Sequence, residues 1–170
     1  MKHVSMGGDS QHQAGMHNAD FTMRKNEKKP LNNLVPIKVL VIDDDEAMVE
    51  MLKLILEPES FHLIIANNSI EGIESISEVL PDVVILSLLM PDMSGWEVCK
   101  AIRSFSQVPI LVLSAISKPG MVSKALDAGA DDYLNKPTTS SVLIAHVKRL
   151  ARRARAENDL DSSNIKYCGV

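Results

Sequence analysis

Short apolar runs and amphipathic segments alternate along the chain from Ile37 onward. Runs rich in Val, Ile and Leu predict buried strands, and apolar residues spaced three and four apart predict helices with one buried face. We predict strands over 37–42, 61–66, 109–113 and 132–135, with a further strand inside the apolar run of 81–91. Helices are predicted over 45–57, 121–128 and 138–155, with one more marked by Ile70, Ile73, Ile76 and Leu80 and another opening at Ser94 and Gly95.

The first of these helices has a stripe of four apolar residues, Met48, Met51, Leu52 and Ile55. Their spacing of i, i+3, i+4 and i+7 predicts that this stripe faces the core. Pro58 is expected to end the helix, because proline cannot continue it. Gly129 is expected to end a later helix as a left-handed cap.

The run over 81–91 is too continuous for a half-exposed strand, so it predicts a central strand covered on both faces. Ser87 is the polar residue at its carboxyl end. In open parallel sheets, ligands bind just outside the carboxyl ends of the strands. Ser87 is therefore expected to face the functional crevice.

Five strands alternating with five helices predict an α/β fold with right-handed crossovers and a doubly wound parallel sheet. The strand order 2-1-3-4-5, which gives a flavodoxin-like three-layer sandwich, is a common solution for this count. The first and third strands are neighbours in that order. The carboxylates of 43–45 are then expected to lie beside Ser87.

The length of 170 residues, with 45% hydrophobic and 24% charged residues, suits one globular domain. We expect this domain over 36–155, a disordered extension over 1–35 and a flexible tail over 156–170. A net charge of -4 gives no general attraction to nucleic acid. Two cysteines, without a signal peptide or membrane span in the sequence, favour a cytoplasmic protein.

Polar side chains are predicted at several neighbouring strand ends: Asp43, Asp44, Asp45, Ser87, Ser114 and Lys136. Clustered carboxylates repel one another unless a cation sits among them, and an oxygen-rich cluster suits Mg²⁺. Lys136 and Ser114 would together suit a phosphoryl group. The alternative for each residue alone is an ordinary solvated turn position.

Over roughly residues 36–155 the chain resembles the receiver domains of two-component response regulators. The resemblance is carried by Val-Leu-Val-Ile-Asp-Asp-Asp at 39–45, Pro-Asp-Val-Val-Ile-Leu at 81–86, Met-Pro-Asp-Met-Ser-Gly at 90–95, Leu-Ser-Ala at 113–115, Ala-Gly-Ala-Asp-Asp-Tyr-Leu at 128–134 and Lys-Pro at 136–137. It implies Mg²⁺ on Asp43 and Asp44, phosphoryl contacts from Ser114 and Lys136, and a switch role for Tyr133.

The family places its phosphate-accepting aspartate four residues before Pro91, where this chain has Ser87. A serine hydroxyl is a weak nucleophile without an adjacent base, so we expect an atypical stand-alone receiver that is not phosphorylated on aspartate. Losing that carboxylate should weaken Mg²⁺ binding and turn Lys136 toward Asp43 or Asp44. Asp82 lies at the far end of the strand, and Asp92 is expected to point past the pocket.

The resemblance implies a signalling protein and not an enzyme, with a histidine kinase or a downstream effector as partner. Homodimers through the fourth helix, fifth strand and fifth helix are a second expectation, using Lys124, Asp131, Asp132 and Arg149. The basic residues over 148–155 are interpreted as cations at a helix carboxyl end. Nucleic-acid binding is not expected, because too few residues follow the domain for an output module.

Two other functions fit parts of the sequence. A Mg²⁺-dependent phosphatase of the haloacid-dehalogenase type could use Asp43, Asp45, Ser114 and Lys136, but it leaves the residues at 128–134 unexplained. The chain could also be the receiver fragment of a DNA-binding transcriptional regulator. A flavin or nucleotide site would need a glycine-rich phosphate loop, which the sequence lacks.

Overall fold

The computed structural model describes the backbone of residues 35–165 and the side chains of residues 35–157. The predicted extension falls outside this range except for its last residue, Val35. The described part contains five strands and six helical segments in the order β1 Ile37–Ile42, α1 Glu46–Leu56, η1 Glu57–Glu59, β2 Phe61–Ala66, α2 Ser69–Val79, β3 Val83–Leu86, α3 Gly95–Arg103, β4 Ile110–Ser114, α4 Pro119–Asp127, β5 Asp132–Asn135 and α5 Ser140–Ile165.

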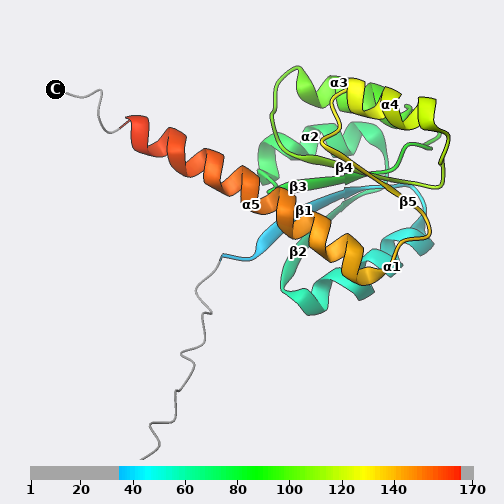
Figure 1. Cartoon of the computed structure of the whole chain (residues 1–170), viewed down its shortest axis with the longest axis horizontal. Helices are drawn as coiled ribbons and strands as arrows, with labels where there is room; N and C mark the ends of the chain where they lie inside the picture. Colours follow the sequence, from blue (N-terminus) through cyan, green and yellow to red (C-terminus); the bar gives the residue numbers. More distant parts are fainter. Residues whose placement is uncertain (1–34, 166–170) are drawn as a thin grey trace, which may run out of the picture. The chain divides into compact units, whose positions relative to one another are not determined.

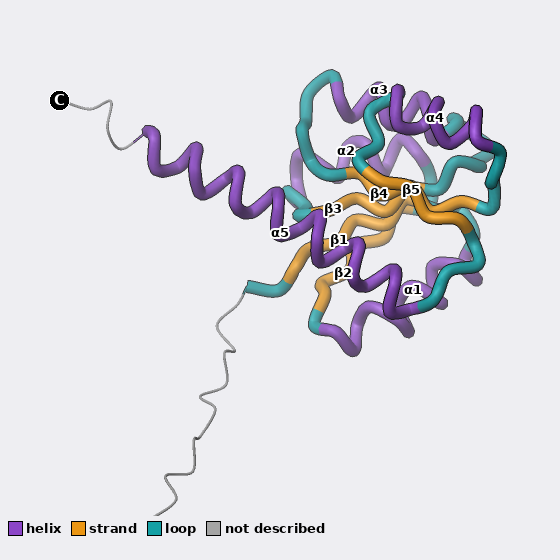
Figure 2. The backbone as a smooth tube through the Cα atoms, viewed as in Figure 1, coloured by secondary structure: helices purple, strands orange, loops and turns teal. Residues whose placement is uncertain are grey.

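All five strands pair in parallel, in the order β2-β1-β3-β4-β5 (Figure 1). This confirms the predicted sheet. β3 is buried along its whole length, because helices cover both faces of the sheet (Figure 2). The central position of the apolar run over 81–91 was therefore correctly predicted from its continuity.

Each strand divides its side chains between two hydrophobic cores. Leu40 and Ile42 of β1 pack with α2, α3 and α4 on one face of the sheet. Val39 and Val41 pack with α1 and α5 on the other face. This alternation follows from the two-residue period of a strand, and it fixes which way the residue after each strand emerges.

The buried stripe of α1 confirms the prediction in part. Leu52 is buried, and Met48 and Ile55 are partly buried against the same core, but Met51 is 38% exposed. Val49 and Leu56, which the sequence pattern did not select, are buried as well. Neighbouring residues on a helix are only about 100° apart, so the pattern placed the buried face slightly off its true direction. Asp45 begins the helix as its N-cap, and Gly129 adopts the predicted left-handed conformation after α4.

α5 continues to Ile165, so the end predicted at residue 155 is wrong. No glycine or proline occurs between Ser140 and Ile165 to stop it. The basic residues over 148–155 are consequently inside the helix and not at its carboxyl end. No helix within residues 35–165 combines the length and the apolar character that crossing a bilayer requires.

Candidate functional site

The carboxyl ends of β1, β3 and β4 lie together, as predicted. Ile42 pairs with Leu86 in the sheet, and the Ser87 N–H donates to the Ile42 carbonyl at 3.0 Å. On the other side, the Lys136 N–H donates to the Ser114 carbonyl at 2.9 Å. These bonds bring the residues that follow β1, β3 and β5 to one edge of the sheet.

Asp43 is the carboxylate that turns into the site. It is only 4% exposed, and its Oδ2 lies 3.4 Å from Lys136 Nζ. Its Oδ1 accepts a hydrogen bond from the Asp45 N–H at 3.0 Å. The expectation that Lys136 turns toward Asp43 or Asp44 is confirmed, with Asp43 as the partner.

Asp44 and Asp45 point elsewhere. Asp44 is exposed to solvent at the rim of the site. Asp45 Oδ1 accepts hydrogen bonds from the Ala47 and Met48 N–H groups, at 3.0 and 3.3 Å, and so caps α1. One of the three adjacent aspartates is therefore structural, one is solvated, and only Asp43 is buried.

Ser87 is 7% exposed and sits at the start of the β3–α3 loop. Its Oγ donates to the Leu89 carbonyl at 3.5 Å, a long bond within its own loop. Among the described residues, its hydroxyl makes no hydrogen bond to a carboxylate or a histidine. The side chain therefore has no base in contact that would activate it as a nucleophile.

Gly95 allows this loop to pack closely. A Cβ at this position would lie 2.4 Å from the Ser87 carbonyl oxygen, and the Gly95 N–H donates to the Leu88 carbonyl at 3.1 Å. The first turn of α3 therefore rests directly on the backbone of Ser87. Any larger residue would push the loop out of place.

Ser114 and Tyr133 both hold the β4–α4 loop at Ile116. Ser114 Oγ accepts from the Ile116 N–H at 3.2 Å, which leaves the Ser114 proton free to point at a ligand. The Tyr133 hydroxyl donates to the Ile116 carbonyl at 2.5 Å. Its ring is half-buried against the core that α2, α3 and α4 cover.

Asp92 makes a contact that the sequence did not predict. Its two oxygens accept hydrogen bonds from the Ser69 N–H at 2.8 Å and from Ser69 Oγ at 3.1 Å. Desolvation raises the pKa of Asp92, but these bonds outweigh it and leave the pKa below its usual range. Asp92 therefore ties the β3–α3 loop to the start of α2. It lies on an exposed loop, and its bonds are to α2 and not to Lys136.

Asp82 lies at the opposite end of β3, as expected. It accepts two hydrogen bonds from Arg155, at 2.8 and 2.7 Å, and a third from the Lys38 N–H at 2.8 Å. Burial raises the pKa of Asp82, but the bonds from Arg155 and Lys38 outweigh it and hold the pKa below its usual range. Asp82 is therefore a structural residue far from Ser87.

The residues predicted for a dimer face are already paired within the chain. Asp131 binds Arg103 at 2.6 Å and also binds Arg153, while Asp132 binds His146 and, at 2.6 Å, Arg149. Lys124 lies over the Trp96 ring, 4.6 Å from its centroid.

The basic residues of α5 are mostly paired as well. Lys148 binds Glu59 at 2.6 Å, and Arg155 binds Asp82 as described. The helix-end explanation of this basic stretch is therefore wrong, since its charges are balanced by acidic partners in the middle of a longer helix.

The side chains of the site provide few ligands for a divalent metal ion. Among the described residues, no three acidic, histidine or cysteine side chains are grouped closely enough to hold one. Asp43 and Asp44 supply two carboxylates, and the third position at the end of β3 carries a hydroxyl. Mg²⁺ prefers six oxygen ligands in strict geometry, so this site fits it only in part.

A family model for the response regulator receiver domain matches residues 39–148. Response regulator MprA of Mycobacterium sp. (strain KMS) is 37% identical over 134 residues, which cover 78% of this chain and 58% of that protein. DNA-binding response regulator MtrA of Mycobacterium leprae (strain TN) is 37% identical over 116 residues, covering 68% of this chain and 52% of that protein. The chain thus spans about half the length of these curated relatives.

Solved structures agree with this match. A two-component response regulator from Clostridium difficile is 35% identical with a TM-score of 0.66, covering 69% of this chain and 97% of that one. A CheY-like response regulator receiver domain protein from Methanospirillum hungatei is 26% identical with a TM-score of 0.67, covering 72% and 99%. The shared core is the five-stranded sheet with its helices.

Proposed function

The chain belongs to the response regulator receiver domain family, and from this premise we propose that it is an atypical receiver that is not phosphorylated on aspartate. Receivers of this family act in two-component signalling. The proposal is that this one acts there through protein–protein contacts alone. Its partner would be a histidine kinase or a downstream effector, in the cytoplasm.

Two observations carry the proposal: the hydroxyl of Ser87 at the phosphate-accepting position, and the contact of Lys136 with Asp43. A hydroxyl stands at the end of β3 where the family has its phosphate-accepting carboxylate. The lysine that would contact a phosphoryl group pairs instead with Asp43 at 3.4 Å. Since Ser87 lacks a base, the site has lost its acceptor and its lysine is occupied.

Weak Mg²⁺ binding belongs to the same proposal. Asp43 and Asp44 are the residues that would hold the ion, and Lys136 would supply positive charge beside Asp43 when no ion is bound. The chain keeps Ser114 and Tyr133 in contact with the β4–α4 loop. We propose that this loop still contributes to partner recognition.

A second candidate is the receiver part of a DNA-binding regulator. It is favoured by the relatives, because MtrA is named as a DNA-binding response regulator and the chain matches 52% of its length. Intact mass of the protein in its source cells would distinguish the two. A species much longer than 170 residues supports the fragment, and one of this length supports the stand-alone receiver.

The phosphatase alternative has less support. It requires Asp45 as an acid in the site, but Asp45 caps α1. Hydrolysis of p-nitrophenyl phosphate with Mg²⁺, abolished by Asp43→Asn, would revive it.

A homodimer through α4, β5 and α5 stays a proposal, and it would have to exchange the bonds that Asp131 and Asp132 make within the chain.

The test of the main proposal is exposure to a small phosphoryl donor, acetyl phosphate, with Mg²⁺. The unaltered chain is expected to gain no phosphate mass, and Ser87→Asp is expected to gain one labile group. Labelling of the unaltered chain at Ser87 or Asp92 would overturn the proposal.

A further inference from the structure

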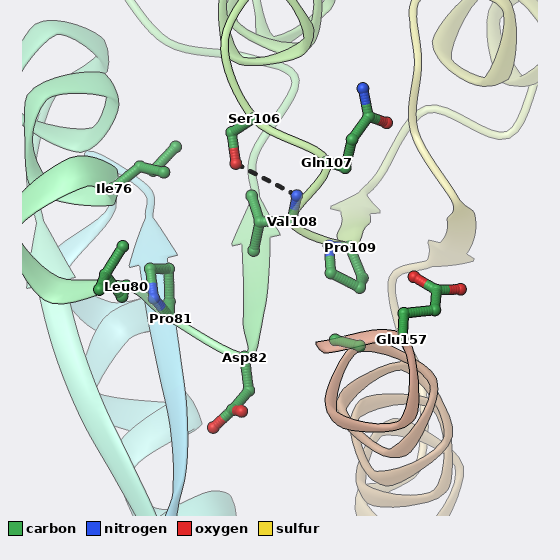
Figure 3. A pocket seen from close by; sticks show the side chains of 10 residues that line it. Ile76, Leu80, Pro81, Asp82, Ser106, Gln107, Val108, Pro109 and Glu157 are labelled. Atoms are coloured by element: carbon green, nitrogen blue, oxygen red, sulfur yellow. Dashed lines mark hydrogen bonds between the residues drawn. The ribbon is translucent and has the colours of Figure 1, made fainter. Parts of the chain in front are cut away.

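A groove of about 720 Å³ opens at the amino-terminal edge of the sheet, away from Ser87 (Figure 3). The end of α2, the α3–β4 loop and α5 form its walls. The apolar part of the lining consists of Ile76, Leu80, Pro81, Val108, Pro109 and Ala154. This α2–α5 groove has the size of a binding pocket, and the chemistry at Ser87 does not use it.

Leu80 lies at the lip of the groove, and both its exposure to water and its backbone conformation are unfavourable for a leucine. It is 73% exposed, which leaves a large apolar side chain in water. It also has φ 50° and ψ 66°, a left-handed conformation that glycine adopts freely and leucine adopts only with strain. This conformation ends α2, because Leu80 is its C-cap and the Leu80 N–H donates to the Ile76 carbonyl at 3.0 Å. The exposed leucine side chain beside an apolar groove is suited to anchor a partner.

The backbone around the groove does not favour an added strand. Pro81 and Pro109 have no N–H to donate. The Val108 N–H is bonded to Ser106 Oγ at 3.2 Å, as the dashed line in Figure 3 shows, and the Asp82 N–H is bonded to the Lys38 carbonyl. A helix needs no backbone partners and presents only side chains, so a helix suits this groove better.

The charges in the lining are Asp82 and Glu157, and both are acidic. Asp82 is neutralised by Arg155, and Figure 3 shows its carboxylate turned away from the 106–109 segment. Glu157 is exposed, and its 3.6 Å contact with Arg153 is a surface pair of small energy. One carboxylate at the rim is therefore able to bind a cation.

We propose that the α2–α5 groove binds an amphipathic helix of a partner protein. The apolar stripe of that helix packs on Leu80, Pro81 and Pro109, and a lysine or arginine on its flank pairs with Glu157. This groove lies at the amino-terminal edge of the sheet and shares only α5 with the face formed by α4, β5 and α5. It provides a second contact point whatever the state of the Ser87 site.

The probe is a fluorescein-labelled synthetic helix of about 18 residues, five turns, with a leucine stripe flanked by lysines. Its fluorescence anisotropy is measured against the full chain. Leu80→Ala should weaken binding roughly tenfold or more, because one leucine anchor is lost. Leu54→Ala is the matched control, since Leu54 is 77% exposed on α1 and should leave binding unchanged. A peptide flanked by glutamates should bind more weakly.

Leu80→Gly separates binding from folding. It removes the backbone strain, so its urea midpoint should equal or exceed that of the unaltered chain while peptide binding is still lost. Equal binding by Leu80→Ala and Leu54→Ala overturns the proposal, as does no binding at peptide concentrations on the order of 1 mM. Sedimentation that shows self-association lost in Leu80→Gly would assign the groove to a second copy, and that also overturns it.

Discussion

Lys136 Nζ lies 3.4 Å from Asp43 Oδ2, so the residue after β5 reaches past the ends of β4 and β3 to the residue after β1. The carboxylate is almost completely buried, and its other oxygen receives the Asp45 N–H. A buried carboxylate needs such partners, because water no longer solvates it. Lys136 therefore gives the buried Asp43 carboxylate a cationic partner inside the domain.

This ion pair should be visible in stability. Lys136→Met is expected to lower the free energy of unfolding by about 1–3 kcal/mol, because it leaves Asp43 buried with one hydrogen bond. Asp43→Asn in the same chain should recover much of that loss, since no charge is then left unpaired. Urea unfolding of the four chains measures the coupling. Lys100→Met, at an exposed lysine of α3, is the control and should change stability by less than about 0.5 kcal/mol. Strictly additive losses at 43 and 136 would show that the two side chains do not interact.

Mg²⁺ affinity should depend on the residue at 87. Ser87→Asp supplies a third carboxylate, so we expect calorimetry to give roughly tenfold tighter binding than in the unaltered chain. Asp43→Asn added to that variant should remove the gain. Equal affinity of the serine and aspartate forms would mean that position 87 is not a metal ligand.

Acidification should weaken the contact between α5 and the start of β3. Asp82 has a lowered pKa in the folded chain, because its bonds to Arg155 and Lys38 outweigh the effect of burial. A carboxyl group with a lowered folded pKa stabilises the fold above its unfolded pKa of about 3.9, and this contribution is lost as the pH falls through the folded value.

The measurement is the urea midpoint of the unaltered chain and of Asp82→Asn, from pH 7 down to about pH 3. Their difference should be largest at neutral pH and should shrink on acidification. Asp127→Asn, at an exposed carboxylate of α4, should show little difference at any pH. If the difference in urea midpoint between the unaltered chain and Asp82→Asn stays constant over this pH range, the role assigned to Asp82 is contradicted.

Cys99 should be inert in the folded chain. Burial raises the pKa of its thiol to about 11, so almost no thiolate exists at neutral pH. In a Cys168→Ser chain we expect iodoacetamide to modify nothing at pH 7.5 without denaturant and one residue in urea, as read by intact mass. Rapid native labelling would show that the α3 side of the core opens readily.

The sheet was predictable because its signals are local. The strands over 37–42 and 61–66 are mostly apolar runs with a helical pattern between them, and right-handed crossovers then leave few strand orders. The buried stripe of α1 was predicted only in part: Leu52 is buried and Met48 and Ile55 pack against the core, but the sequence pattern did not show that Val49 and Leu56 are buried more fully. The continuation of α5 past 155 was missed because its apolar period stops there, while no glycine or proline follows to end the helix before Ile165.

At the site, the sequence identified the residues but not their arrangement. It could not say that Asp43 alone turns inward, or that Asp45 caps α1. The bond between Asp92 and Ser69 joins residues 23 positions apart, so only the folded chain reveals it. The left-handed Leu80 was equally hidden, because leucine gives no signal for that conformation.

The most direct test of the central claim compares phosphate uptake by the unaltered chain and by Ser87→Asp. Both are incubated with acetyl phosphate and Mg²⁺, and their intact masses are recorded before and after mild base, which cleaves acyl phosphates. We predict no added phosphate on the unaltered chain and one base-labile phosphate on Ser87→Asp. A base-labile phosphate on the unaltered chain would contradict the account, because some other aspartate would then be serving as the acceptor.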